Sequence, residues 1–298
     1  MSKALHITAL IVSHNRREMT LNAVRALIRN SGPVLLTILL FDDGSTDQTS
    51  AAVQESFPEV IVRHGDGTFF WNRGLHQSWL EALKQPSDAV LWLNDDVMID
   101  EKIFEKILAY WHVAARRRPD RRFILVGATR DSRQNITYGG QIRRDSCVSY
   151  KLESVTPEAD LVPIDTFHGN FVIVPREVTQ VIGLNDPAYH HNFGDIDYGL
   201  RALKAGIDVL LLPGTVGICE RNTLKYEQGY GSPSLSIFEQ WRKVNSHHGL
   251  PPRTWFRFTR RHSGLYFPIH FLAPYRHLII PRWSRTALSG WKARRPSR

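Results

Sequence analysis

The stretch that decides the fold is Ala89-Val90-Leu91-Trp92-Leu93-Asn94-Asp95-Asp96. Its five apolar residues in a row are typical of a strand that is buried on both faces of a sheet. Two adjacent carboxylates at the end of such a strand need solvent or a cation, because an unpaired buried charge is costly. Open α/β sheets build ligand sites at the carboxyl ends of their strands. The stretch therefore predicts a largely parallel sheet with an acidic site at one edge.

A second acidic pair, Asp42-Asp43, ends another buried run over residues 34–41. Two strand ends that each carry paired acids indicate a metal-dependent nucleotide site, because Mg²⁺ and Mn²⁺ bind through one or two carboxylates plus phosphate oxygens. Either pair alone is equally explained by a turn or a helix cap. The prediction therefore depends on the two pairs occurring together with the motifs described below.

Strand-like and helix-like segments alternate through the first half of the chain. The expected strands are 6–13, 34–41, 60–63, 89–93 and 123–128, and the expected helices are 16–30, 46–57, 73–84 and 101–118. This order predicts an α/β fold with a mixed, mostly parallel sheet flanked by helices. Residues 129–165 change to short segments and turns, which predict antiparallel strands. A helix over 195–205 and a last strand over 207–212, ended by Pro213-Gly214, are expected further on.

Composition limits the class of protein. The 298 residues, 42% of them apolar, suffice for one large α/β domain with an appendage. Two cysteines cannot form a disulfide framework, so the sequence fits a reducing compartment. The first residues lack the layout of a signal peptide, and no apolar run is long enough for a membrane span. These features predict a cytoplasmic protein.

Charge is distributed unevenly along the chain. Residues 240–298 contain 13 Lys/Arg and no Asp or Glu, which leaves 25 basic and 29 acidic residues in 1–239. The basic segment also carries many aromatic residues after position 251. Basic and aromatic side chains together suit an anionic membrane interface. We therefore expect a domain over 1–235 and a basic aromatic extension over 236–298, whose residues 251–298 associate with the inner face of the cell membrane. A packed pair of terminal helices with a solvated basic face explains the same pattern.

Asp195 is the candidate catalytic base. It follows Gly194 at the expected start of a helix, where a fixed carboxylate could accept a proton from a hydroxyl nucleophile. A role as helix cap explains the same residue. The absence of Gly-x-Gly-x-x-Gly after the first strand counts against a dinucleotide oxidoreductase.

Five motifs in chain order resemble those of family 2 glycosyltransferases with a GT-A fold, over about residues 5–222. They are Ile11-Val12-Ser13-His14-Asn15-Arg16, Asp42-Asp43-Gly44-Ser45-Thr46-Asp47, Asn94-Asp95-Asp96, Gly169-Asn170-Phe171 and Gly194-Asp195-Ile196-Asp197. The resemblance implies that Asp96 ligates a divalent metal, Mn²⁺ or Mg²⁺, and that Asp195 is the catalytic base. The residues that it implies for the nucleotide are Val12, Ser13, Asn15, Asp43, Asn94 and Asp95. Those that it implies for the acceptor are His168, Gly169, Asn170 and Asp197.

The chain departs from the family pattern at three places. Asn94 replaces the first acid of the Asp-x-Asp motif, and Gly194 replaces the acid that often precedes the base. Cys219-Glu220 lies near the position of a late His that ligates the metal in many relatives. These substitutions lower the charge of the expected metal site and leave its full ligand set open.

The resemblance implies an inverting, non-processive transferase of the EC 2.4 class. It would move a sugar from a nucleotide-diphosphate sugar to a hydroxyl of a glycan or lipid-linked glycan, in bacterial surface polysaccharide synthesis. Asp195 would take the proton of the attacking hydroxyl while a metal on Asp96 stabilises the leaving diphosphate. Two alternatives stay open: a nucleotidyltransferase, which shares strand-end acids, and a non-catalytic protein that binds a nucleotide or, through the basic extension, a nucleic acid.

Overall fold

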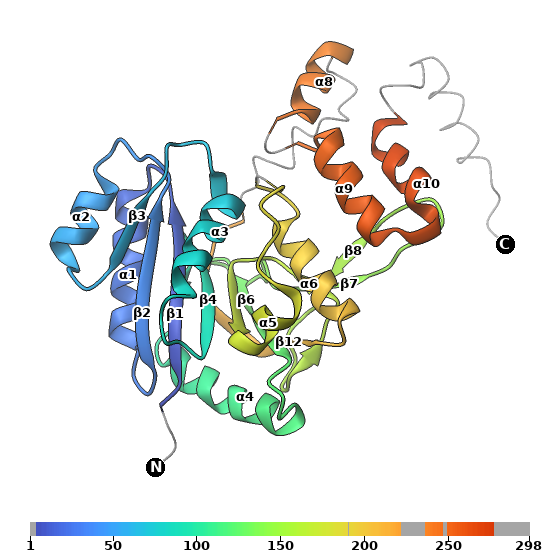
Figure 1. The fold of residues 1–298 in the computed structure, drawn as a ribbon. Coiled ribbons are helices and arrows are strands. Elements are labelled where there is room, and N and C mark those ends of the chain that lie inside the picture. Colours follow the sequence, from blue (N-terminus) through green and yellow to red (C-terminus); the bar gives the residue numbers. More distant parts are fainter. Residues whose placement is uncertain (1–3, 190, 222–235, 247–248, 277–298) are drawn as a thin grey trace. The chain divides into compact units, whose positions relative to one another are not determined.

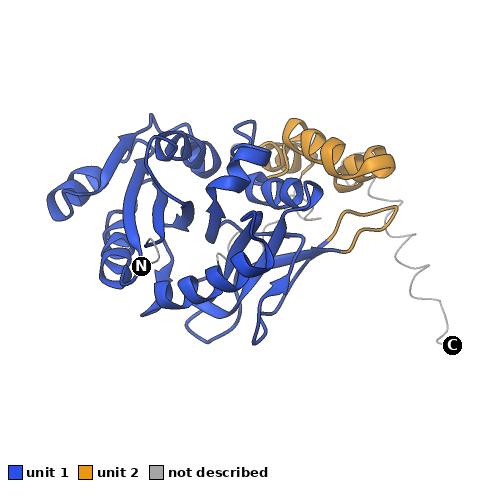
Figure 2. Cartoon of the chain, turned by 60° about the horizontal axis from the view of Figure 1, so that its bottom comes forward, with its two compact units in different colours: residues 1–143, 152–221 blue, residues 144–151, 222–298 orange. Residues whose placement is uncertain are grey.

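The computed structural model describes residues 4–189, 191–221, 236–246 and 249–276. The chain divides into two compact units, which Figure 2 colours separately. Unit 1 contains residues 1–143 and 152–221, and unit 2 contains residues 144–151 and 222–298. The predicted domain boundary after residue 235 lies outside the described residues and stays a prediction.

A mixed sheet forms the centre of unit 1 (Figure 1). Its described strands lie in the order β3-β2-β1-β4-β11-β6-β12-β5, and β9 pairs with β12. Their bounds are β1 (His6–Ser13), β2 (Leu35–Asp42), β3 (Ile61–His64), β4 (Ala89–Asn94), β5 (Met98–Ile99), β6 (Phe123–Arg130), β9 (Val162–Pro163), β11 (Phe171–Pro175) and β12 (Asp208–Ile218). The first four strands in this order are parallel, β11 runs antiparallel to both of its neighbours, and β12 is parallel to β6. The predicted mixed, mostly parallel sheet is confirmed.

Helices cover both faces of this sheet (Figure 1). One face packs against α1 (Arg17–Asn30), α2 (Thr49–Ser56) and α4 (Ile103–Arg117), and the other against α3 (Phe70–Ala82), α5 (Arg176–Ile182) and α6 (Gly194–Lys204). Alternation along β1 explains the two layers, since successive side chains of a strand point to opposite faces. Ile7, Ala9 and Ile11 join the first layer, whereas Leu10 and Val12 join the second. Both faces are apolar because both are covered.

The predicted antiparallel region is also confirmed. A second sheet has the order β10-β7-β8, with β7 (Gly140–Arg143), β8 (Leu152–Ser154) and β10 (Thr166–Phe167). The chain then returns through residues 168–170 into the central sheet. This return places a short loop directly before β11.

The register of β1, β2 and β4 places the ends of these strands, and the acids that follow them, side by side at one edge of the sheet. Ser13 on β1 pairs with Asp42 on β2, and Val12 pairs with Asn94 on β4. Each strand therefore ends beside its neighbour, and the residues that follow the three strands meet at one edge of the sheet. This edge is where a parallel sheet places its ligand sites.

Two expectations about elements near this edge were wrong. The last strand does not end at Pro213-Gly214, because β12 continues to Ile218 with register shifts between Leu211 and Gly217. A bulge absorbs the proline, which cannot donate to the ladder. Asp195 is not the N-cap of its helix, since α6 begins at Gly194 and Asp195 lies in the first turn.

Unit 2 is a small helical body. It contains α8 (Ile237–Val244), α9 (Pro252–His262) and α10 (Phe267–Leu272), with short 3₁₀ turns η1 (Gly264–Tyr266) and η2 (Ala273–Tyr275). Its core joins α9 and α10 to the hairpin tip 144–151: the Trp255 indole N–H donates to the His270 carbonyl over 3.1 Å, and the ring of Tyr150 lies 5.2 Å from that of Phe258. Residues 277–298 of the predicted extension lie outside the described part. No helix within the described ranges has the length and hydropathy needed to cross a bilayer.

Candidate active site

Asp95 and Asp96 lie directly after β4, at the edge where the parallel strands end. The side chain of Asp95 is 5% exposed and that of Asp96 is 34% exposed. Burial raises the pKa of Asp95 to about 6, although the nearby Arg16 guanidinium opposes this shift. One oxygen of Asp95, Oδ2, is buried and accepts no hydrogen bond from the described residues. The pair therefore combines a desolvated carboxylate with one that reaches solvent.

Arg16 lies in the turn between β1 and α1 and contacts both carboxylates. Its Nη1 donates to Asp95 Oδ1 over 2.9 Å and to Asp96 Oδ2 over 3.1 Å. The sequence assigned no role to this residue, although it closes the first motif. Arg16 lies 80 residues before Asp96 in the sequence, so their contact could not be predicted without the parallel register of β1 and β4.

Asp43 is 3% exposed and uses its carboxylate to hold the next loop in place. Oδ1 accepts from the Gly67 N–H over 2.9 Å, and Oδ2 accepts from the Phe70 N–H over 2.8 Å. Gly44, with a φ of +70°, makes a tight turn after this residue. The predicted contact between Asp43 and a nucleotide base is not tested by these bonds and stays a prediction.

The turn after β1 is tied to the turn after β2. The side-chain oxygen of Asn15 accepts from the Thr46 N–H over 2.7 Å, and its own backbone N–H donates to Ser45 Oγ over 2.8 Å. Val12 and Ser13, the other predicted nucleotide residues of this segment, are buried at the end of β1. The side chain of Asn15 is exposed, so of these three it is the one that a ligand can reach.

Asp195 is held in the first turn of α6 by two backbone N–H groups. Gly169 donates to its Oδ2 over 2.9 Å, and Ile196 donates to its Oδ1 over 2.8 Å. Burial raises the pKa of Asp195, while the neighbouring His168 and these two N–H groups oppose the shift. A carboxylate with a raised pKa and a fixed orientation is suited to accept a proton near neutral pH.

His168 directly precedes Gly169, whose N–H donates to this carboxylate. Burial lowers its pKa, which the charge of Asp195 opposes. Its ring packs against that of Tyr138 at 5.4 Å, and its Nδ1 is buried without a hydrogen-bond partner in the described chain. The lowered pKa favours a neutral imidazole beside Asp195.

Contacts connect Asp195 to the acidic pair. Asn170, the second residue after His168, accepts at its carbonyl from the Asn94 N–H over 3.1 Å. Its side-chain N–H donates to Cys219 Sγ over 3.6 Å, and the Cys219 thiol donates to Asp96 Oδ1 over 3.5 Å. The predicted catalytic, metal and acceptor residues from Asn94 to Asp195 therefore lie in one connected network.

Cys219 enters this network because β12 continues through Pro213-Gly214. The residue follows the last residue of that strand, and its thiol is buried. Burial raises the pKa of this thiol, so it stays protonated and donates to Asp96. The sequence placed Cys219 near the late metal ligand of relatives but gave it no role.

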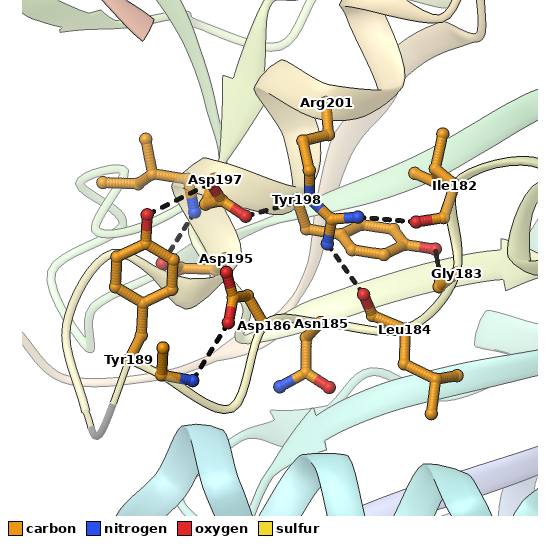
Figure 3. Close-up of polar contacts among 12 residues, drawn as sticks. Ile182, Gly183, Leu184, Asn185, Asp186, Tyr189, Asp195, Asp197, Tyr198 and Arg201 are labelled. Carbon is orange, nitrogen blue, oxygen red and sulfur yellow. Dashed lines mark hydrogen bonds and ion pairs between the residues drawn. The ribbon is translucent and has the colours of Figure 1, made fainter. Parts of the chain in front are cut away.

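Asp197 differs from the other candidates because its side chain is fully buried. It accepts from Arg201 Nε over 2.9 Å and from the Tyr189 hydroxyl over 3.2 Å (Figure 3). Arg201 also donates to the carbonyls of Ile182 and Leu184. In this structure Asp197 positions α6 against residues 182–189, and its predicted contact with an acceptor stays a prediction.

Trp71 forms a wall beside Asp195. A Cβ atom on Gly169 would lie 2.4 Å from Trp71 Cη2 and 3.3 Å from Asp195 Cβ, so the indole edge and the carboxylate flank the same glycine. The indole packs at 6.2 Å from the ring of Trp92, which is in the core. Aromatic faces next to a carboxylate suit a sugar ring, which has apolar C–H faces and polar hydroxyls.

The oxygen donors fit a hard divalent cation. Within the described residues, no group of three or more His, Cys, Asp and Glu side chains is arranged to hold a metal alone. One or two carboxylates, completed by water and phosphate oxygens, are nevertheless the usual protein share of a Mg²⁺ or Mn²⁺ site. Asp96 and the unpartnered oxygen of Asp95 supply that share.

Residues 8–137 match the sequence model of Glycosyl transferase family 2. This segment, which is less than half of the chain, is therefore similar to glycosyl transferase family 2. It contains the motifs around Asp43 and Asp96, whereas His168 and Asp195 lie beyond it. The prediction of a GT-A fold is confirmed, and the match over residues 8–137 supports the resemblance to the family. Glycosyltransferase activity of the EC 2.4 class, inversion and non-processive transfer stay predictions.

Two solved structures resemble the chain in fold. The crystal structure of GalNAc-T7 with UDP, GalNAc and Mn²⁺ is 16% identical, with a TM-score of 0.55 over 93% of this chain and 54% of that protein. The mannosyltransferase PcManGT from Pyrobaculum calidifontis, in complex with GDP-Man and Mn²⁺, is 16% identical, with a TM-score of 0.51 over 99% of this chain and 77% of that protein. The chain spans about half the length of the GalNAc-T7 structure. Comparison with curated proteins finds no match.

Proposed function

We propose that the chain is an inverting, non-processive glycosyltransferase that moves one sugar from a nucleotide-diphosphate sugar to a hydroxyl group of a glycan or lipid-linked glycan. The observation that carries this proposal is the network from Asp96 through Cys219, Asn170 and Gly169 to Asp195. It joins a donor-side carboxylate pair to an acceptor-side base at one edge of the sheet. The family match supports the donor half, since it covers residues 8–137.

The reaction is a single displacement at the anomeric carbon. Asp195 accepts the proton of the acceptor hydroxyl as that oxygen attacks the anomeric carbon from the face opposite the diphosphate. The new glycosidic bond forms while the bond to the diphosphate oxygen breaks, and both electrons leave with the nucleoside diphosphate. One displacement inverts the anomeric configuration. The backbone N–H groups of Gly169 and Ile196 donate to the Asp195 carboxylate and fix its orientation for this proton transfer.

A divalent metal is part of the proposal, with Asp96 as its main ligand and Asp95 beside it. The bound cation supplies positive charge to the diphosphate of the leaving group. Both solved relatives were obtained with Mn²⁺, one with UDP and one with GDP-Man. We infer that the donor of this chain is likewise a nucleoside-diphosphate sugar, bound by Asn15 and the residues around Asp43, Asn94 and Asp95.

A panel of UDP-, dTDP- and GDP-sugars, titrated calorimetrically with and without Mn²⁺ into wild type and Asp96→Ala, tests the donor site. Binding of one nucleotide that requires Mn²⁺ and is lost in Asp96→Ala is expected. NMR of the product from that donor and a glycan acceptor then reports the anomeric configuration, and retention would contradict the single displacement. Release of pyrophosphate from a nucleoside triphosphate would instead favour a nucleotidyltransferase.

Unit 2 supports a second part of the proposal, association with an anionic membrane surface. Five large apolar side chains of α9, η1 and α10 face solvent, and Leu265 is 97% exposed; they are Phe256, Leu265, Tyr266, Ile269 and Leu272. Residues 249–276 contain no Asp or Glu, and Arg253, Arg260 and Arg276 are exposed. Part of the predicted aromatic set is buried instead, since Trp255, Phe258 and Tyr275 form the core of the unit. Exposed apolar groups flanked by arginines suit the headgroup region of an anionic bilayer.

Vesicle sedimentation tests this surface. Wild type is expected to sediment with phosphatidylglycerol-containing vesicles but not with neutral ones, and Leu265→Glu with Ile269→Glu is expected to abolish the effect. These two residues are exposed, so the pair of changes leaves the core of unit 2 intact. Salt-sensitive binding to an oligonucleotide without binding to vesicles would favour a nucleic-acid partner instead.

A further inference from the structure

Arg16 occupies the position of a cation between the two site carboxylates. A single nitrogen, Nη1, donates to both Asp95 and Asp96, at 2.9 and 3.1 Å. The side chain is 44% exposed. Within the described residues its Nε and Nη2 make no hydrogen bond, so most of the donors of this guanidinium point at no protein acceptor.

Other paired arginines of unit 1 are used differently. Arg130 donates through Nη1 and Nη2 to both oxygens of Asp100, each over 2.7 Å. Arg201 uses Nε, Nη1 and Nη2 on one carboxylate and two carbonyls. Guanidinium groups that bind protein acceptors through two or three of their nitrogens hold structure together. Arg16 instead has unused N–H donors beside the candidate ligand site, and these donors could bind a ligand.

The backbone of Arg16 is fixed while its side chain is half exposed. The Arg16 carbonyl accepts from both the backbone N–H and the hydroxyl of Thr20, each over 2.9 Å. The Thr20 hydroxyl is also bonded to Ser13 Oγ over 2.7 Å, at the end of β1. A rotation of the arginine side chain therefore leaves the turn in place.

Charge shows why Arg16 and a divalent metal compete. The two adjacent carboxylates repel each other, and Arg16 offsets one of the two negative charges. A divalent cation held by these two carboxylates would lie close to the guanidinium that now bridges them. Two cations that close to each other repel strongly in a partly desolvated site. The guanidinium must then turn away, and a diphosphate beside the metal offers it acceptors that match its planar fork.

We propose that Arg16 is the resident cation of the Asp95–Asp96 pair and that it moves to the donor diphosphate when a divalent metal takes these carboxylates. This inference rests on the proposed function for its diphosphate half. The part that concerns the metal depends only on the side chains of Arg16, Asp95 and Asp96, which are already in contact. Arg16 thereby keeps the buried Asp95 charge paired before the donor binds and adds a second positive charge to the leaving diphosphate afterwards.

The test measures two ligands separately on the full chain. Mn²⁺ alone is titrated by electron paramagnetic resonance into wild type, Arg16→Gln and Arg16→Lys. The nucleoside diphosphate that binds wild type, and its monophosphate, are then titrated by calorimetry at saturating Mn²⁺. Arg63→Gln is the matched control, because Arg63 pairs with Glu81 on the surface of unit 1. Thermal melting of each variant verifies that it folds.

Arg16→Gln is expected to bind Mn²⁺ at least threefold more tightly than wild type, since the competing cation is gone. It is expected to bind the diphosphate at least tenfold more weakly, with a smaller loss for the monophosphate. Arg16→Lys should keep the Mn²⁺ affinity of wild type but lose part of the diphosphate affinity, because it lacks the fork. Arg63→Gln should change neither affinity.

Unchanged or weaker Mn²⁺ binding by folded Arg16→Gln would overturn the inference. Equal losses for monophosphate and diphosphate would overturn it too, because the effect would then not follow the diphosphate. If wild type binds no nucleoside diphosphate at all, the proposed function fails, and the diphosphate half of the inference fails with it. If wild type binds the nucleoside diphosphate and Arg16→Gln binds it equally well, the inference about Arg16 fails while the proposed function stands.

Discussion

The backbone N–H of Gly169 donates a hydrogen bond of 2.9 Å to Oδ2 of Asp195. Gly169 lies in the loop between β10 and β11, whereas Asp195 lies in the first turn of α6, 26 residues later. The bond fixes the orientation of a carboxylate whose burial raises its pKa. It also sets the carboxylate next to the residue, Asn170, that continues toward the acidic pair.

Asp195→Asn is expected to lower kcat by about 10²–10⁴-fold, the usual contribution of a general base. The amide keeps the size of the side chain and can still accept the Gly169 bond through its oxygen, so the fold and the donor site should survive. Steady-state kinetics and calorimetric titration of the nucleotide measure the two effects. Loss of nucleotide binding together with kcat would show that Asp195 supports the fold rather than the proton transfer.

The pH dependence of kcat/KM follows from the raised pKa of Asp195. The base acts only when it is deprotonated, so activity falls as the pH drops through its pKa. Because burial raises that pKa, the acidic limb of the profile should lie above the range of an ordinary carboxyl group. His168→Gln should leave the limb above the ordinary carboxyl range, because the burial of Asp195 is the main cause of its raised pKa. A limb at the ordinary carboxyl range in both proteins would contradict this role.

Gly169→Ala is expected to reduce kcat by about 10²-fold, the effect of displacing a catalytic group by about 1 Å. The new methyl group would lie 2.4 Å from Trp71 Cη2, so the indole, the loop or Asp195 must move. Trp71→Phe removes the atoms that clash, and the double variant should therefore recover activity relative to Gly169→Ala alone. A double-mutant cycle on kcat measures this coupling, and strictly additive losses would contradict the packing argument.

The parallel sheet and the acidic edge could be predicted from sequence because the information is local. A run such as residues 89–93 is apolar at every position, which predicts a buried strand, and acids directly after it must lie at the edge of the sheet where the strand ends. Asp95 and Asp96 were placed correctly at the end of β4 for the same reason.

Contacts between distant residues could not be predicted in this way. Pro213-Gly214 is a strong local signal for the end of a strand, but pairing with β6 outweighs it and brings Cys219 to Asp96. The bond from Arg16 to the acidic pair depends on the register of β1 against β4. The buried position of Asp197 depends on Arg201, one helical turn away, and on Tyr189 in the preceding loop.

Asp197→Asn is expected to lower the free energy of unfolding by about 3 kcal/mol, because it leaves the Arg201 guanidinium without its buried counter-charge. Chemical denaturation measures the change. Asp208→Asn is the matched control, since Asp208 pairs with Arg118 at a more exposed position, where such a pair contributes about 1 kcal/mol or less. Equal effects of the two variants would show that burial does not decide the strength of the Asp197 pair.

Asp95→Asn is expected to stabilise the metal-free, nucleotide-free protein above pH 6 and to have little effect on its stability near pH 4. The pKa of Asp95 is raised from 3.8 to about 6, so the folded protein holds this proton more tightly than the unfolded chain does. The stability that Asp95 contributes in its protonated form is therefore present below pH 4 and is lost as the pH rises through 6. The full difference is on the order of 3 kcal/mol. Asparagine resembles the protonated acid and avoids this loss.

Thermal melting of wild type and Asp95→Asn at pH 4 and pH 7.5, in the presence of a chelator, measures the effect. The difference between the two melting temperatures should be near zero at pH 4 and favour the variant by several degrees at pH 7.5. Asp96→Asn is the control, since Asp96 is more exposed and follows Asp95 directly. A melting temperature of Asp95→Asn below that of wild type at pH 7.5 would mean that the bond from Arg16 outweighs the cost of burying the carboxylate. The same variant should bind the donor nucleotide more weakly, because it lacks the negative charge of Asp95. That charge destabilises the fold when it is buried, but the proposed metal site and Arg16 depend on it.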